Sequence, residues 1–238
     1  MHGESSGVTD GKGSKKTAGD PKGHARKAYE GIRRMLFHNE IVAGQKIAYR
    51  DLAERLGMSQ TPVIQALKWL EFQQLVHHVP NRGYYTAPIR LQEVGEIYEL
   101  RELIELSLLP KTMAALDNGK IRRLEASFNA HARASREVYL YDRLERDMQF
   151  HLTLASLSGA GVQQKVLEDL FDLLYLKYGG KFLFSTPMAS ADADHRALIE
   201  RIAARDLSGA RKTLARHIRR VRDHVIQGVE KLLAATRL

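Results

Sequence analysis

Residues 49–82 read YRDLAERLGMSQTPVIQALKWLEFQQLVHHVPNR, and their pattern predicts the fold of the N-terminal part of the chain. Residues 49–56 predict a short amphipathic helix that ends at Gly57, a residue suited to the left-handed conformation of a helix end. Ser59 then stands where a helix N-cap is expected, with Pro62 in the first turn, where a missing N–H is harmless. Two helices joined by a glycine-containing turn are the layout of a helix-turn-helix.

The flanking segments extend this motif to a winged helix over residues 24–88. Apolar residues recur at helical spacing over 24–41 and predict a first helix. After the motif, the strand-like runs 75–79 and 84–86 flank the turn-rich residues 80–83. A β-hairpin directly after the third helix is a wing, so three helices plus a β-hairpin are expected here.

The rest of the chain predicts helices alone. Apolar stripes of helical period occupy six segments and no strand pattern competes with them; the segments are 90–115, 120–134, 137–157, 162–179, 190–205 and 207–234. We therefore expect an all-α six-helix bundle over 89–238 and a mainly α protein. Residues 1–23 are rich in Gly, Ser, Lys and Asp without apolar periodicity, which predicts a disordered tail.

Composition narrows the class of protein. The 238 residues suit two domains, and the absence of cysteine excludes disulfides and thiolate metal sites. No stretch approaches the roughly 18 apolar residues of a membrane span, so we expect a soluble, cytoplasmic protein with no membrane partner. The net charge of +9, of which +5 lies in the first 89 residues, favours a polyanionic partner, nucleic acid first.

A second pattern places titratable side chains on apolar helix faces. Asp147 and His151 lie one turn apart on such a stripe, and His195, His217 and His224 sit among apolar residues of the last two expected helices. An ionised carboxylate and several imidazoles facing one core are costly unless they pair or share a cation. One aspartate and three histidines are a suitable ligand set, although an isolated histidine on an apolar face is more often a satisfied core residue.

The stretch 49–82 resembles the winged helix of the GntR regulators of the FadR subfamily, whose pattern LAxxLGVSRTPVREALxxLExxGLV is followed by a wing PNRG. The likeness covers about residues 28–230. The family pairs this winged helix with a C-terminal all-helical FCD effector domain. The resemblance implies a transcription regulator, not an enzyme, that binds a palindromic operator in double-stranded DNA as a homodimer and senses a small carboxylate metabolite.

The resemblance also points to residues that contact DNA. Of three family arginines that contact the operator, only Arg50 matches, because Gln60 and Ile64 stand at the two recognition-helix positions. The usual glutamate after the second of these is Gln65. The DNA-contact candidates are Arg50, Ser59, Gln60, Thr61, Gln65, Arg82 and Gly83. Alternatively, Thr61 only builds the helix start and the glutamines are solvated surface.

In the metal-binding branch of the FCD family, an Asp-x3-His on one helix joins single histidines from the two final helices. Four residues match, namely Asp147, His151, His195 and His217. His224 is the one rival for the last place. Imidazole and carboxylate ligands suit a divalent ion, zinc first and nickel, manganese or iron as alternatives.

Arg101 matches an FCD arginine that points into the same cavity, where it would hold an effector carboxylate through two hydrogen bonds. The alternative is an ion pair with Glu105 one turn away. Tyr98, Tyr175 and Tyr178 either line this cavity or only pack. Two other functions remain open at this point: a metal-dependent enzyme that uses the Asp/His cluster, and a metal-free structural helical module.

The two replaced arginines predict a changed operator. At both positions the chain lacks an arginine that could recognise guanine through two hydrogen bonds. Glutamine instead pairs with adenine, and isoleucine contacts a thymine methyl group. Selection from random DNA duplexes should therefore return half-sites shifted toward A·T pairs. Recovery of the usual family consensus, with its G·C steps intact, would contradict this prediction.

Overall fold

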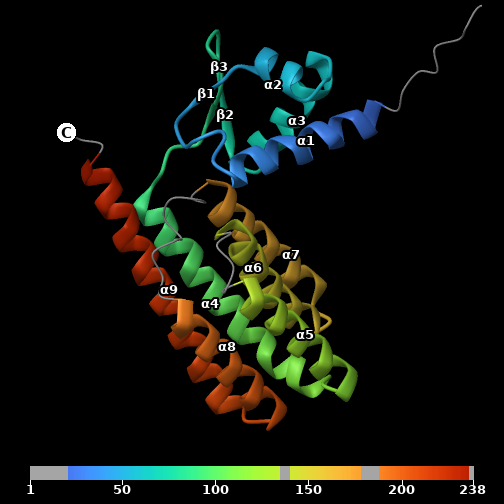
Figure 1. The fold of residues 1–238 in the computed structure, drawn as a ribbon, viewed down its shortest axis with the longest axis vertical. Coiled ribbons are helices and arrows are strands. Elements are labelled where there is room, and N and C mark those ends of the chain that lie inside the picture. Colours follow the sequence, from blue (N-terminus) through green and yellow to red (C-terminus); the bar gives the residue numbers. More distant parts are fainter. Residues whose placement is uncertain (1–20, 135–139, 178–187, 236–238) are drawn as a thin grey trace, which may run out of the picture.

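The computed structural model of the chain describes residues 21–134, 140–177 and 188–235. Figure 1 shows a winged helix seated on one end of an elongated helical bundle. The expected mainly α class is confirmed. The elements are α1 (Pro21–Phe37), β1 (Lys46–Ile47), α2 (Tyr49–Arg55), α3 (Gln60–Phe72), β2 (Val76–Val79), β3 (Gly83–Thr86), α4 (Leu91–Ala114), α5 (Asn118–Ala134), α6 (Leu140–Ser156), α7 (Gly161–Asp172), η1 (Leu173–Lys177), α8 (Met188–Ala203) and α9 (Leu207–Ala235).

The first helix starts earlier and ends earlier than its apolar pattern predicts. It begins at Pro21, so the last residues of the expected tail are helical, and the remainder of that tail lies outside the described residues. It ends at Phe37 because Asn39 takes a left-handed conformation with φ 54° and the Glu40 N–H donates to the Met35 carbonyl at 2.8 Å. Asparagine tolerates this conformation, which closes a helix C-terminus.

The turn between α2 and α3 is the one that the sequence predicts. Gly57 has φ +62°, and the Met58 N–H donates to the Ala53 carbonyl at 2.9 Å, which ends α2. Ser59 stands at the N-cap of α3 in an extended conformation, but its hydroxyl makes no capping hydrogen bond. The expected apolar face of α3 is buried against the other winged-helix elements; it comprises Val63, Ala66, Leu67 and Leu70.

The wing is confirmed, and a third strand joins it. β2 and β3 pair antiparallel, with Val79 opposite Gly83. β1 pairs with the other side of β3, with Ile47 opposite Tyr84, so the sheet order is β1-β3-β2. Sequence patterning missed β1 because two residues cannot show an alternation of apolar and polar side chains.

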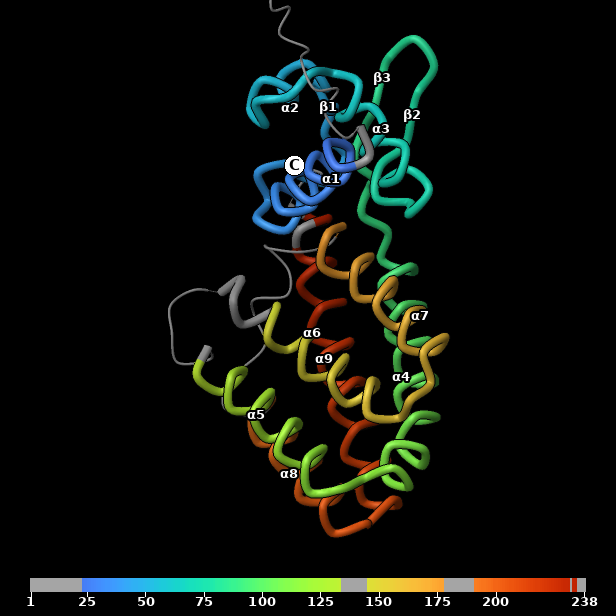
Figure 2. Tube along the Cα trace, turned by 90° about the vertical axis from the view of Figure 1, so that its right-hand side faces the viewer, coloured from blue at the N-terminus to red at the C-terminus, as the bar shows by residue number. Residues whose placement is uncertain are grey.

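The bundle is built from α4 to α9, and the six expected helices are confirmed within the described residues. α4 packs along α9, α5 along α6 and α8, and α7 along α4 and α6; Figure 2 shows α4 and α7 next to each other on one side of the bundle. The segment expected as one helix over 162–179 divides into α7 and the π-helical turn η1, and Tyr178 lies outside the described residues. No helix within the described ranges is both long and apolar enough to cross a membrane.

Candidate metal centre and DNA-contact surface

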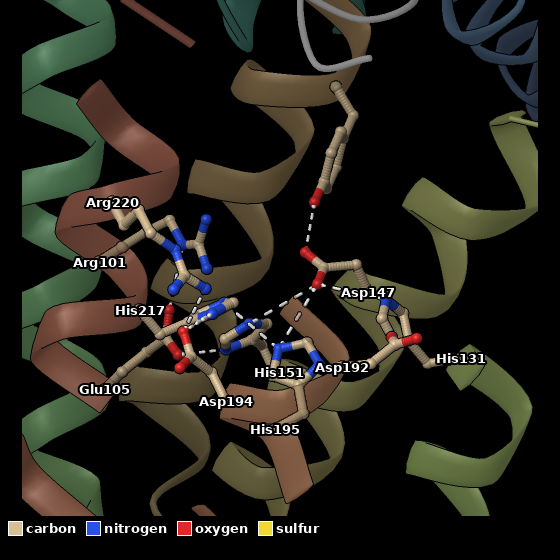
Figure 3. Close-up of polar contacts among 11 residues, drawn as sticks. Arg101, Glu105, His131, Asp147, His151, Asp192, Asp194, His195, His217 and Arg220 are labelled. Carbon is tan, nitrogen blue, oxygen red and sulfur yellow. Dashed lines mark hydrogen bonds and ion pairs between the residues drawn. The ribbon is translucent and has the colours of Figure 1, made fainter. Parts of the chain in front are cut away.

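Four predicted ligands converge inside the bundle. Asp147 and His151 come from α6, His195 from α8 and His217 from α9. One ligand atom of each lies within 4.8 Å of those of the other three, and the three histidines are buried. Figure 3 shows the imidazoles and the Asp147 carboxylate turned toward one another. The structure therefore brings together residues that lie up to 70 positions apart in the chain.

The distances match a site for a small cation. His195 Nε2 lies 3.2 Å from His217 Nε2 and 3.6 Å from Asp147 Oδ1. His151 Nε2 lies 4.0 Å from the same carboxylate oxygen. Ligands at zinc distances on a tetrahedral ion stand about 3.4 Å apart. Small movements of these side chains would thus suffice to enclose an ion.

Two buried carboxylates orient the imidazoles. Glu105 Oε2 lies 2.6 Å from His151 Nδ1, and Asp194 Oδ2 lies 3.3 Å from His217 Nδ1. Because a carboxylate accepts, these contacts place the proton on Nδ1 and leave the Nε2 lone pair facing the centre. Carboxylates commonly hold metal-bound histidines in this way. His151 Nε2 is buried and has no hydrogen-bond partner, so the four residues fit a metal ion.

A fourth histidine, which the sequence interpretation missed, lies beside Asp147. His131 of α5 is buried, and its Nε2 is 3.7 Å from Asp147 Oδ1. Its Nδ1 is 3.1 Å from Asp192 Oδ1. His131 follows Leu124 and Phe128 at helical spacing, so the apolar stripe of residues 120–134 was the signal that could have found it.

Burial and neighbouring charges control ionisation at this centre. Burial alone would raise the pKa of the Asp147 carboxyl, but the surrounding histidines, His151 and His195 foremost, hold it well below its usual range. Burial lowers the pKa of His195 well below the ordinary value, and the nearby His217 adds to this effect. Burial also lowers the pKa of His217, although the hydrogen bond to Asp194 opposes the shift. An ionised aspartate beside neutral imidazoles is the protonation state that a divalent cation requires.

The expected effector residues lie next to this centre. Arg101 is buried, and its Nε donates to Glu105 Oε1 at 3.0 Å, so the ion pair considered as an alternative is present. The guanidinium also lies 4.2 Å from the Phe171 ring centroid and 5.2 Å from that of Tyr98. The Tyr175 hydroxyl donates to Asp147 Oδ2 at 3.2 Å. Arg101 is thus joined through Glu105 to His151, one of the predicted ligands.

A second arginine lies near His217. Arg220 of α9 pairs with Asp194, the carboxylate that contacts His217 Nδ1. In the view of Figure 3, Arg101 and Arg220 lie to one side of the histidines and His131 to the other. Neither Asp194 nor Arg220 was predicted, because their pairing forms only once the successive helices α8 and α9 pack against each other.

The candidate DNA-contact residues gather on the winged helix. Arg50 is on α2, Gln60, Thr61 and Gln65 are on the N-terminal half of α3, and Ser59 precedes α3. All five are exposed, and so is Arg82 at the tip of the wing. Gly83 is half-buried and has φ +93°, a conformation that a side chain would strain. Side chains on the first turns of a recognition helix are those that reach base edges.

Two family patterns match the chain. Residues 24–85 match the description "Bacterial regulatory proteins, gntR family". Residues 96–220 match the FCD domain, which alone covers more than half of the 238 residues. The first match spans the winged helix and the second spans the Asp/His centre.

Relatives and solved structures agree with these matches. An HTH-type transcriptional regulator from an unstable DNA locus of Streptomyces ambofaciens is 27% identical over 201 residues, 84% of each chain. The HTH-type transcriptional repressor RspR of Escherichia coli K12 is 21% identical over 84% of this chain and 87% of its own. The structure of E. coli McbR/YncC has a TM-score of 0.74 at 19% identity, over 86% of this chain and 97% of its own.

The buried histidines predict a pH-dependent stability when metal is absent. Because His195 and His217 have lowered pKa values in the folded protein, the unfolded chain binds protons that the native state does not once the pH falls below about 6.5. With a chelator present, the midpoint temperature of thermal unfolding should be lower at pH 5.5 than at pH 7.5. In the variant His195→Gln, the midpoint temperature should depend less on pH. An unchanged pH dependence in that variant would contradict a lowered pKa of His195 in the folded protein.

Proposed function

Because the chain belongs to the GntR family of bacterial regulatory proteins and carries an FCD domain, we propose that it is a metabolite-responsive repressor. It binds a palindromic operator as a dimer and holds a divalent metal ion among Asp147, His151, His195 and His217. The family matches and the relatives identify a transcription regulator, not an enzyme. The single observation that carries the metal-sensing part is the convergence of these four ligand atoms within 4.8 Å.

In this proposal α3 enters the major groove. One face of α3 is exposed and carries Gln60, Thr61 and Gln65. The opposite face is buried in the winged-helix core. Arg50 on α2 and Arg82 in the wing are both exposed and suit phosphate contacts, which set the position on DNA without reading its sequence. The glutamines then supply the base contacts.

The dimer face proposed here is an exposed apolar strip across α4 and α7. Four aliphatic side chains form it, with exposed fractions of 47% for Leu100, 68% for Leu103, 82% for Val162 and 44% for Val166. Isologous interfaces place the same patch of both subunits face to face. If two copies of α4 crossed antiparallel at Leu103, Glu96 of one copy would lie toward Lys111 of the other. We therefore take a second copy of the chain as the occupant of this strip.

A charge within the strip should separate the subunits. Wild-type protein is expected to sediment as a dimer, and Leu103→Glu as a monomer, because two carboxylates would meet at the proposed two-fold axis. Val42→Glu is the matched control, since Val42 is an exposed aliphatic residue of the winged helix, 42% exposed. A monomeric wild type, or a Leu103→Glu protein that remains dimeric, would refute this face.

The metal and the effector share one region of the bundle. A divalent ion supplies positive charge for an anionic ligand, and an ion that expands beyond its four protein ligands would also bind that anion directly. Arg101 extends this electropositive region, and its pairing with Glu105 leaves other N–H groups of the guanidinium to bind a small carboxylate. The Tyr98 ring lies against the Arg101 guanidinium, and the Tyr175 hydroxyl donates to Asp147. An organic acid is therefore the effector class that the site favours.

Zinc titration tests the metal site. Metal-free wild-type protein should bind one zinc ion per chain and gain stability, by about 4 kcal/mol when free zinc exceeds the Kd a thousandfold. His217→Ala should weaken zinc binding by more than about 100-fold, since loss of an outer carboxylate partner alone typically weakens it by about 10- to 100-fold. Calorimetry and thermal unfolding measure the two effects.

The matched control is His224→Ala, on the same helix but outside the cluster of ligand atoms. It should bind zinc as the wild type does. Equal losses in both variants, or a wild type that binds no zinc, would instead favour histidines that only pack in a structural bundle. A thermal-shift screen of small carboxylates on the zinc-loaded protein then identifies the effector class.

A further inference from the structure

The π-helical turn η1 lies where the two hydrophobic cores meet. Leu174 and Tyr175 are buried in the core of the bundle, whereas Leu176 is buried in the core of the winged helix. Leu173 packs against both cores. π-helical turns are rare and frequently occur at functional sites. Any shift of η1 would therefore alter the packing of both the bundle and the winged helix.

On the bundle side, η1 contacts the metal centre directly. The Tyr175 hydroxyl donates to Asp147 Oδ2 at 3.2 Å, while Oδ1 of the same carboxylate faces His195 at 3.6 Å. The Tyr175 ring is stacked on Phe171 one turn earlier, with centroids 5.7 Å apart. A change in the position of the Asp147 carboxylate thus acts on a buried side chain of η1 that is stacked on α7.

On the winged-helix side, Asp172, the residue just before η1, pairs with Arg33 of α1. Asp172 accepts two hydrogen bonds from the Arg33 guanidinium, at 2.6 and 2.5 Å. Arg33 also donates to the Tyr29 hydroxyl at 3.1 Å, and that hydroxyl donates to Gln73 Oε1 at 2.8 Å. Gln73 is the C-cap residue of α3, the helix that carries the candidate base-reading residues.

We propose that η1 couples the metal centre to α3. Tyr175 moves with the Asp147 carboxylate, and the Asp172–Arg33 pair transmits this displacement to α1 and to the C-terminal end of α3. The inference rests on the proposed function in that a metal ion must bind at Asp147. Ligation draws the carboxylate toward the histidines, Tyr175 follows its hydrogen-bond acceptor, and η1 moves Asp172. Asp172 and Arg33 are positioning residues in this scheme, since neither touches the ion or DNA.

Amide hydrogen exchange of the full-length protein, with zinc as the only added ligand, tests the coupling. In the wild type, zinc should change exchange in α1 and in the C-terminal half of α3 by about fivefold or more, the lower end of usual coupling factors. Asp172→Asn should keep zinc affinity within about twofold and lose this zinc-dependent change. Tyr175→Phe should lose it as well, with the ring packing retained.

The matched control is Asp169→Asn, which removes the same charge one turn earlier, where Asp169 pairs with Lys165 at 2.9 Å. It should retain the zinc-dependent change. A purely structural role of Asp172 would alter exchange equally with and without zinc, and that result would overturn the proposal. Zinc binding by the wild type without any change in α1 or α3 would overturn the coupling alone, whereas no zinc binding would overturn the proposed metal site and the coupling together.

Discussion

Asp147 brings an ionised carboxylate into the interior of a helical bundle, and the elements around it are arranged to compensate its charge. A buried charge is unfavourable by several kcal/mol unless well-placed partners replace the lost water. Here α5, α6, α8 and α9 each supply a histidine, and η1 supplies the Tyr175 hydroxyl. Burial lowers the pKa of His195 and of His217, so these two imidazoles bring no positive charge to the carboxylate at neutral pH. A divalent cation bound as proposed among Asp147, His151, His195 and His217 would supply that charge and would link the geometry of the bundle to ligand sensing.

Most of the winged helix could be predicted from local chemistry. Gly57 ends α2 because its backbone adopts φ +62°, and the apolar face of α3 is visible in the spacing of residues 63–70. Other features depend on contacts that the local sequence does not encode. β1 exists only through pairing with β3, and Ser59 stands at its N-cap position without using its hydroxyl.

The candidate site divides in the same way. Asp147 and His151 could be found because one turn of helix separates them, and His195 and His217 because each interrupts an apolar stripe. The carboxylates that contact the imidazoles from outside could not be found in this way, since Glu105 lies 46 positions from His151 in the sequence. The coupling through η1 is likewise tertiary, because the pattern of residues 162–179 predicts an uninterrupted helix and gives no sign of a π-helical turn.

Anomalous diffraction from crystals of the zinc-loaded protein, recorded at the zinc absorption edge, would locate the ion. If Asp147 and the three histidines hold the ion, one strong peak per chain lies inside the bundle, with Asp147 Oδ1 and the Nε2 atoms of His151, His195 and His217 at about 2.0 to 2.2 Å from it. A peak elsewhere on the chain, or ligation through Nδ1 with Glu105 and Asp194 released, would contradict it.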